Sequence, residues 1–165
     1  DDVNVGALSD WVVAAPHAKV TFANGTVKYA DTGWQIKGVG NTDNWDGAVV
    51  ETGYYKLGAT PVDVTGTFAA WTTKTIETPN TDGSNYYVKA GDVVKFTIED
   101  VNLTTATNQD WFKNYTFSVT TPVSGATVDA KLTTPGTATD EAIVTITVTL
   151  GNTLSEGMTV TVISI

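Results

Sequence analysis

The chain has no cysteine and no arginine, and only one histidine among its 165 residues. Without cysteine, no disulfide stabilises the fold, and cysteine pairing says nothing about the redox compartment. All nine basic residues are lysines, and the formal net charge is −9 at pH 7. Because no guanidinium is present to bind phosphates and the acidic surface repels them, we expect no nucleic-acid partner.

Long hydrophobic runs are also missing. No stretch approaches the roughly 18 apolar residues of a membrane-spanning helix, and a chain with this net charge is repelled by anionic lipids. We therefore expect a soluble protein with no membrane insertion. The first residues, DDVNVGALSDW, lack the basic, apolar and small-residue regions of a signal peptide, so we expect a mature or trimmed boundary there.

Few residues are suited to catalysis. His17, the single histidine, follows Pro16, and no Gly-x-Ser-x-Gly motif accompanies it, so a serine triad is not indicated. We expect His17 to be a solvated or capped residue near a strand end. The glutamates occupy turns or outward strand positions, where a carboxylate is solvated rather than poised as an acid: Glu51, Glu77, Glu99, Glu141 and Glu156. We expect the protein not to be an enzyme.

Two acidic loops contain the only candidate metal ligands. Calcium prefers about six to eight oxygen ligands from carboxylates, amides and backbone carbonyls. The candidates are Asn41, Asp43, Asp46, Asn80 and Asp82. Neither loop has the spacing of an EF-hand, and turn formation explains the same residue types. The prediction is therefore no cofactor, with calcium left open as an ion that these loops could hold.

Alternation of apolar and polar residues recurs along the chain and indicates β-strands throughout. The clearest element is the segment 19–29, KVTFANGTVKY, with Asn24-Gly25 at its centre. Asn-Gly favours a two-residue hairpin turn, because both central residues need positive φ. We expect Val20 and Phe22 to face Val27 and Tyr29 across this turn.

The remaining alternating segments predict an all-β antiparallel sandwich of about ten short strands, Ig-like or jelly-roll-like. These segments are 33–39, 48–57, 61–73, 86–88, 93–101, 115–120, 126–132, 142–150 and 158–165. In the segment 142–150 the residues Ala142, Val144 and Ile146 share one face with Val148 and Leu150, and threonines share the other. This pattern predicts one buried and one solvated face.

We expect one domain across residues 1–165. The polar run 78–85, TPNTDGSN, is the best candidate for a subdivision, since it contains both Pro and Gly. Each half would have about 80 residues and would bury a smaller share of its surface than one joined sandwich. We therefore interpret the run as a loop within one sandwich.

A Lys-Ala-Gly-Asp turn at residues 89–92 leads into an alternating strand, and Gly-Ala-Thr-Val and Thr-Val-Thr-Val segments follow later. This half of the chain resembles the β-sandwich modules strung along bacterial surface proteins and polysaccharide-degrading systems. Those modules are Ig-like or carbohydrate-binding. The resemblance implies a bacterial extracellular or cell-surface location, as one monomeric module of a larger multidomain chain.

Strand phase divides the aromatic residues into two groups. Trp34 shares a face with Ile36, Tyr55 with Leu57, and Tyr115 with Phe117, so these are expected in the core. Trp71 and Tyr54 fall out of phase with their buried neighbours and are expected to point outward unless a bulge intervenes. Trp45 and Trp111 stand in polar loops.

Exposed indole and phenol rings beside amides and carboxylates are suited to a sugar, whose C–H face stacks on a ring while its hydroxyls form hydrogen bonds. The predicted ligand-binding residues are Trp45, Trp71, Trp111, Tyr54, Asn44, Asp46, Gln109, Asp110 and Lys113. We expect a non-catalytic carbohydrate-binding module that binds a neutral polysaccharide of the starch, xylan or β-glucan class. The alternative is an Ig-like structural spacer or adhesin module in which each tryptophan covers the end of the sandwich.

Overall fold

The computed structural model describes residues 11–12, 16–30, 35–36, 48–78, 81–100 and 109–165. These residues form fourteen β-strands and one short 3-10 helix, Gln109–Asn114, which confirms the prediction of an all-β fold. No helix in the described ranges is long and apolar enough to cross a membrane.

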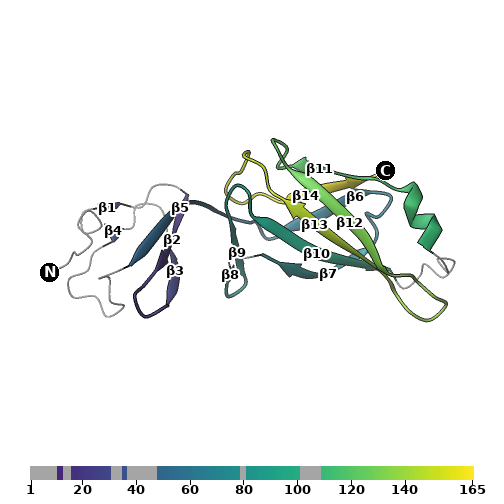
Figure 1. Cartoon of the computed structure of the whole chain (residues 1–165), viewed down its shortest axis with the longest axis horizontal. Coiled ribbons are helices and arrows are strands. Elements are labelled where there is room, and N and C mark those ends of the chain that lie inside the picture. Colours follow the sequence, from purple (N-terminus) through teal and green to yellow (C-terminus); the bar gives the residue numbers. More distant parts are fainter. Residues whose placement is uncertain (1–10, 13–15, 31–34, 37–47, 79–80, 101–108) are drawn as a thin grey trace.

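Two facing sheets form a sandwich (Figure 1). One has the order β12-β13-β10-β7, and the other has the order β11-β14-β6. Their bounds are β6 Val62–Gly66, β7 Thr72–Glu77, β10 Val93–Asp100, β11 Phe117–Thr121, β12 Thr127–Thr134, β13 Ala142–Thr149 and β14 Val160–Ser164. Every second residue of β13 is buried, as its alternating sequence predicts. Neighbouring strands are antiparallel except β6 and β14, which are parallel.

A third sheet has the order β3-β2-β5-β9-β8, and β1 pairs with β4. The bounds are β1 Trp11–Val12, β2 His17–Thr21, β3 Val27–Ala30, β4 Gln35–Ile36, β5 Val49–Lys56, β8 Thr81–Asp82 and β9 Asn85–Val88. The predicted hairpin at Asn24-Gly25 is present as β2 and β3, but its turn is one residue longer than predicted. The Phe22 N–H donates to the Thr26 carbonyl, and the Gly25 N–H donates to the Phe22 carbonyl. Val27 therefore lies opposite Thr21 rather than Phe22.

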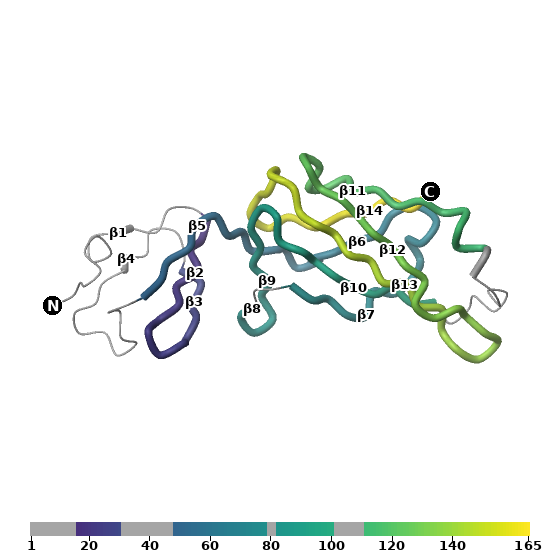
Figure 2. Tube along the Cα trace, in the orientation of Figure 1, coloured from purple at the N-terminus to yellow at the C-terminus, as the bar shows by residue number. Residues whose placement is uncertain are grey.

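The described buried apolar residues form two clusters. The larger cluster fills the sandwich, and Phe96, Ile98, Val144 and Ile146 at its centre are fully buried. The smaller cluster lies under the β2–β3–β5 part of the third sheet and consists of Ala18, Val20, Phe22, Ala30 and Ala48. Figure 2 shows β5 running from beside β2 and β3 toward the sandwich.

The segment 78–85 leads from β7 of the sandwich into β8 and β9 of the third sheet. β7 precedes this segment and β10 follows it, yet the two strands pair directly, with Phe96 opposite Ile76. That residues 1–165 form a single domain stays a prediction.

Candidate functional site

Several predicted ligand-binding residues have no described side chain. Trp45, Asn44 and Asp46 lie outside the described residues, as does the core candidate Trp34. Gln109 and Asp110 begin the 3-10 helix, and only their backbone is described. Lys113 is an exposed residue in the last turn of this helix.

The prediction that Tyr54 is exposed was wrong, because this residue is only 2 % exposed. β5 is out of register with β2 at this point: His17 lies opposite Tyr54, whereas Ala18 lies opposite Thr52. The unpaired residue between them is Gly53, whose φ of 90° is accessible to glycine but strained for other residues. The bulge turns Tyr54 inward and leaves Tyr55 half-buried.

The prediction that Trp71 projects from a strand was also wrong. The expected strand 61–73 is interrupted after Gly66 by a turn, in which the Ala69 N–H donates to the Gly66 carbonyl and the Trp71 N–H to the Phe68 carbonyl. Phe68 is therefore buried at 1 % exposure, and Trp71 packs on it edge to face, 4.7 Å between ring centroids. Strand phase cannot predict the direction of a side chain in a turn.

An aromatic cluster closes the end of the sandwich around Phe68. Its members are Phe68, Trp71, Trp111, Phe112, Tyr115 and Phe117. Trp71 and Trp111, both half-buried, lie with ring centroids 6.3 Å apart and planes tilted by 41°. The structure therefore brings two of the predicted sugar-binding residues together, but their rings do not form one flat platform.

The indole nitrogen of Trp111 has an unusual environment. Nε1 is buried and has no hydrogen-bond acceptor among the described residues. A buried donor without an acceptor usually costs about 1–3 kcal/mol. The ring contacts of Trp111 with Phe68 and Tyr115 are therefore the contacts that stabilise it, in contrast to the unsatisfied Nε1 donor.

A second group of rings lies where the third sheet meets the sandwich. Tyr29 stacks on Tyr87 at 4.2 Å with parallel planes and meets Tyr54 edge to face at 5.8 Å. Burial, followed by the neighbouring Tyr54, raises the pKa of Tyr29 to about 12. Burial also raises the pKa of Tyr54, with Glu51 adding to the effect. Lys89 lies 5.4 Å from the Tyr54 ring centroid and 3.3 Å from the Glu51 carboxylate.

His17 begins β2, so its predicted place near a strand end is confirmed, but of the two predicted alternatives it is not solvated, since it is buried at 7 % exposure. Its Nε2 lies 2.5 Å from Glu156 Oε2, and its Nδ1 lies 3.1 Å from the Ala30 carbonyl oxygen. The Ala30 carbonyl can only accept, so Nδ1 is the donor in that hydrogen bond. The other Glu156 oxygen accepts the Lys56 N–H at 2.9 Å. Glu156 thus connects β2 and β5 to the loop before β14. Its contact with His17 joins residues 139 positions apart, which the sequence pattern could not indicate.

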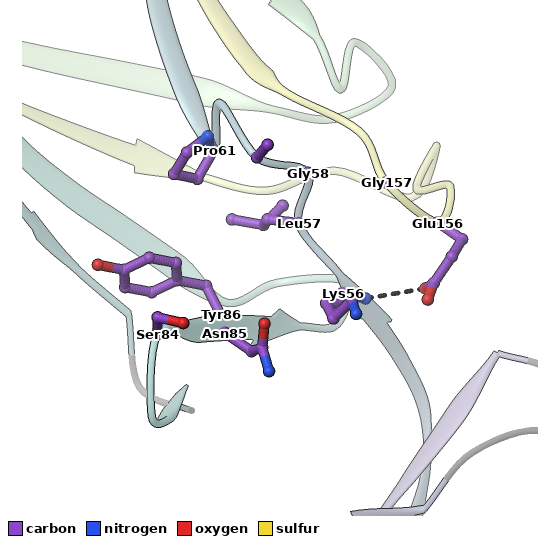
Figure 3. Close-up of a pocket in the computed structure, with 10 residues that line it drawn as sticks. Lys56, Leu57, Gly58, Pro61, Ser84, Asn85, Tyr86, Glu156 and Gly157 are labelled. Atoms are coloured by element: carbon purple, nitrogen blue, oxygen red, sulfur yellow. Dashed lines mark hydrogen bonds between the residues drawn. The ribbon is translucent and has the colours of Figure 1, made fainter.

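A pocket of about 480 Å³ adjoins Glu156 (Figure 3). Its lining comes from the connection between β5 and β6, from the start of β9 and from the loop before β14. The lining residues are Lys56, Leu57, Gly58, Ala59, Pro61, Ser84, Asn85, Tyr86, Glu156 and Gly157. None of these residues was predicted as a ligand-binding residue, because their side chains converge only in the folded chain.

One further acidic group lies on the sandwich surface. Hydrogen bonding to Glu141, together with burial, raises the pKa of Glu99, and Lys74 lies 3.8 Å from each carboxylate. Within the described ranges, no group of three or more histidine, aspartate or glutamate side chains is placed to hold a metal ion. Of the calcium candidates, only Asp82 falls in those ranges, where it is exposed.

Comparison of the chain with protein-family models, with curated proteins and with solved structures finds no match in any of the three.

Proposed function

We propose that this protein is a structural spacer module of a bacterial cell-surface protein, which separates neighbouring parts of a longer chain and withstands tension along it. The observation that carries this proposal is the parallel pairing of β6 with β14. Tension enters the sandwich through the chain preceding β6 and leaves it after β14. Because β6 and β14 are parallel, this tension pulls them in opposite directions along their length. All the hydrogen bonds between the two strands then carry the force at the same time.

The contact between these strands is continuous. Five register pairs run from Val62 opposite Val160 to Gly66 opposite Ser164. Further backbone hydrogen bonds extend the contact at both ends, from Gly58 to Met158 and from Thr67 to Ser164. Buried Ser164 adds a side-chain link, since its Oγ accepts the Phe68 N–H and donates to the Thr65 carbonyl, both at 3.0 Å. Separating these strands therefore requires many bonds to break at once.

Strand order also supports an Ig-like spacer. In an Ig sandwich, strands A, B, E and D form one sheet, and strands C, F and G form the other. Here β7, β10, β13 and β12 occupy the positions of the first sheet, while β11 and β14 occupy those of C and F. β6 takes the place of the last strand, although it is the first of the seven sandwich strands in chain order, and it pairs parallel to β14.

Single-molecule force spectroscopy tests the spacer proposal. The chain has no cysteine, so handles attach only where one is introduced. Pulling through the two chain ends should give a high unfolding force. Handles at Val123→Cys and Asn152→Cys, two exposed loop positions flanking the antiparallel β12–β13 hairpin, should give a force several-fold lower, because that pair opens one hydrogen-bonded pair at a time. Equal forces in the two geometries would contradict a mechanical role.

Carbohydrate binding is the second candidate function. It is favoured by the adjacent position of Trp71 and Trp111, two half-buried residues at the end of the sandwich, close in sequence to exposed Lys113. A neutral polysaccharide that stacks on these rings would be bound through the C–H faces of its sugars. The tilt between the rings suits a curved chain better than a flat one.

Affinity electrophoresis on starch, xylan, β-glucan and mannan tests this candidate. If the Trp71–Trp111 surface binds one of them, migration slows on that polymer and changes little with salt, since no counterions are released. Unchanged migration on all four polymers would contradict carbohydrate binding by this end of the sandwich and would leave the spacer as the proposed function of the protein.

A further inference from the structure

Backbone hydrogen bonds hold the pocket beside Glu156 in shape. The Leu57 N–H donates to the Tyr86 carbonyl, the Gly58 N–H to the Met158 carbonyl and the Gly157 N–H to the Lys56 carbonyl. At Gly58 the two backbones approach so closely that an added Cβ would lie 2.5 Å from the Gly157 carbonyl oxygen. The three walls are therefore fixed relative to one another, and an occupant would meet a largely preformed site.

The lining is apolar on one side and polar on the other. Leu57 and Pro61 lie above the half-buried Tyr86 ring, and the Ser84 and Asn85 side chains lie beside it (Figure 3). Glu156 lies at the Lys56 side, its carboxylate held by His17 and by the Lys56 N–H. The Glu156 side chain is 47 % exposed and lines the pocket, so its carboxylate is accessible to an occupant.

The charges in the pocket favour a neutral ligand. Lys56 and Glu156 contribute opposite charges, and the acidic balance of the whole chain opposes an anion. Donors and acceptors are both present, in the Ser84 hydroxyl, the Asn85 amide, the Lys56 ammonium and the Glu156 carboxylate. The volume falls in the range of about 300–1,000 Å³ that small-molecule sites occupy.

We propose that this pocket binds a neutral sugar residue, with the C–H face of the ring on Tyr86 and its hydroxyls on Asn85, Ser84 and Glu156. A sugar combines an apolar face with several hydroxyls that both donate and accept, which matches an apolar wall opposite a mixed set of polar groups. This site lies at the junction of the third sheet with the sandwich and is separate from the Trp71–Trp111 surface. It does not depend on the spacer proposal.

The test is an NMR titration of the intact chain with glucose, galactose, mannose, xylose and N-acetylglucosamine at millimolar concentration. Binding in the pocket shifts the amide signals of residues 56–58, 84–86 and 156–157 with at least one of these sugars. If none of the sugars shifts these signals, or if the shifts occur only around Trp71 and Trp111, the proposal is wrong.

Two mild substitutions identify the contacts. Asn85→Ala should weaken the affinity by about fivefold, the amount expected for one lost hydrogen bond, and Tyr86→Phe tests the hydroxyl alone while keeping the ring. Asn152→Ala, at an exposed asparagine outside the pocket, is the matched control and should bind as the unmodified protein does. An Asn85→Ala affinity equal to that of the control would overturn the assignment.

Discussion

Trp71 and Trp111 show why neither strand phase nor a polar stretch of sequence is enough to place a tryptophan in solvent. Trp111 stands among aspartate, lysine and asparagine, and strand phase predicted Trp71 to point outward, yet each ring packs on Phe68 at the end of the core. Their neighbours are held in a turn and in a 3-10 helix, which direct consecutive side chains differently from a strand. At the scale of single residues, burial here depends on local backbone geometry more than on the polarity of the neighbours.

We expect Trp71→Ala and Trp111→Ala each to lower the free energy of unfolding by about 3 kcal/mol, because each leaves a cavity against Phe68. Denaturant unfolding measures the change. Val123→Ala, at a loop residue that is 58 % exposed, is the control and should stay within about 0.5 kcal/mol of the unmodified protein. If both tryptophan variants match the control, the rings contribute little to the core and their role is at the surface.

At the scale of elements, the bulge at Gly53 decides which side of β5 faces inward. It places Tyr54 beside Tyr29, whose ring stacks on Tyr87 of β9. The three tyrosines thereby connect β3, β5 and β9 across the third sheet. A simple alternating strand would have turned Tyr54 away and left Tyr29 with fewer ring contacts.

This tyrosine group predicts a loss of stability in alkali. The fold raises the pKa of Tyr29 from 10.0 to about 12, so the native state favours the neutral phenol. The resulting stabilisation is complete below pH 10 and is lost as the pH rises through about 12. Tyr29→Phe cannot ionise and should show a shallower decrease. Denaturant unfolding across this pH range measures both proteins, and parallel curves would show that Tyr29 ionisation is not linked to folding.

At the scale of the whole molecule, the described buried residues form a small cluster and a large one of unequal size. The smaller cluster has five described buried residues, three of them alanines, and buries little apolar surface by itself. Among the described residues, its connections to the sandwich include β5, the pairing of β5 with β9, the stacking of Tyr29 on Tyr87, the Lys89–Glu51 ion pair and the bonds of Glu156 with His17 and Lys56. We infer that the smaller cluster depends on the sandwich for its stability.

Calorimetry of Glu156→Ala tests this dependence. The unmodified chain should unfold in one cooperative transition, whereas the variant should lose about 1 kcal/mol and separate a lower-temperature transition of the smaller cluster. Glu77→Ala, which removes an exposed carboxylate that lies 3.9 Å from the ammonium of Lys95, is the matched control. A single transition in Glu156→Ala, at the temperature of the control, would show that Glu156 does not couple the two clusters.

The sequence by itself determined the all-β class, the alternating faces of strands such as β13, and the hairpin at Asn24-Gly25. These features depend on period-two burial and on local turn chemistry, which act between residues close in the chain. Only the tertiary structure decided the inward turn of Tyr54, the burial of His17 against Glu156 and the pocket beside it. A bulge shifts strand phase by one residue, and the His17–Glu156 contact joins residues 139 positions apart, so no local pattern encodes either result.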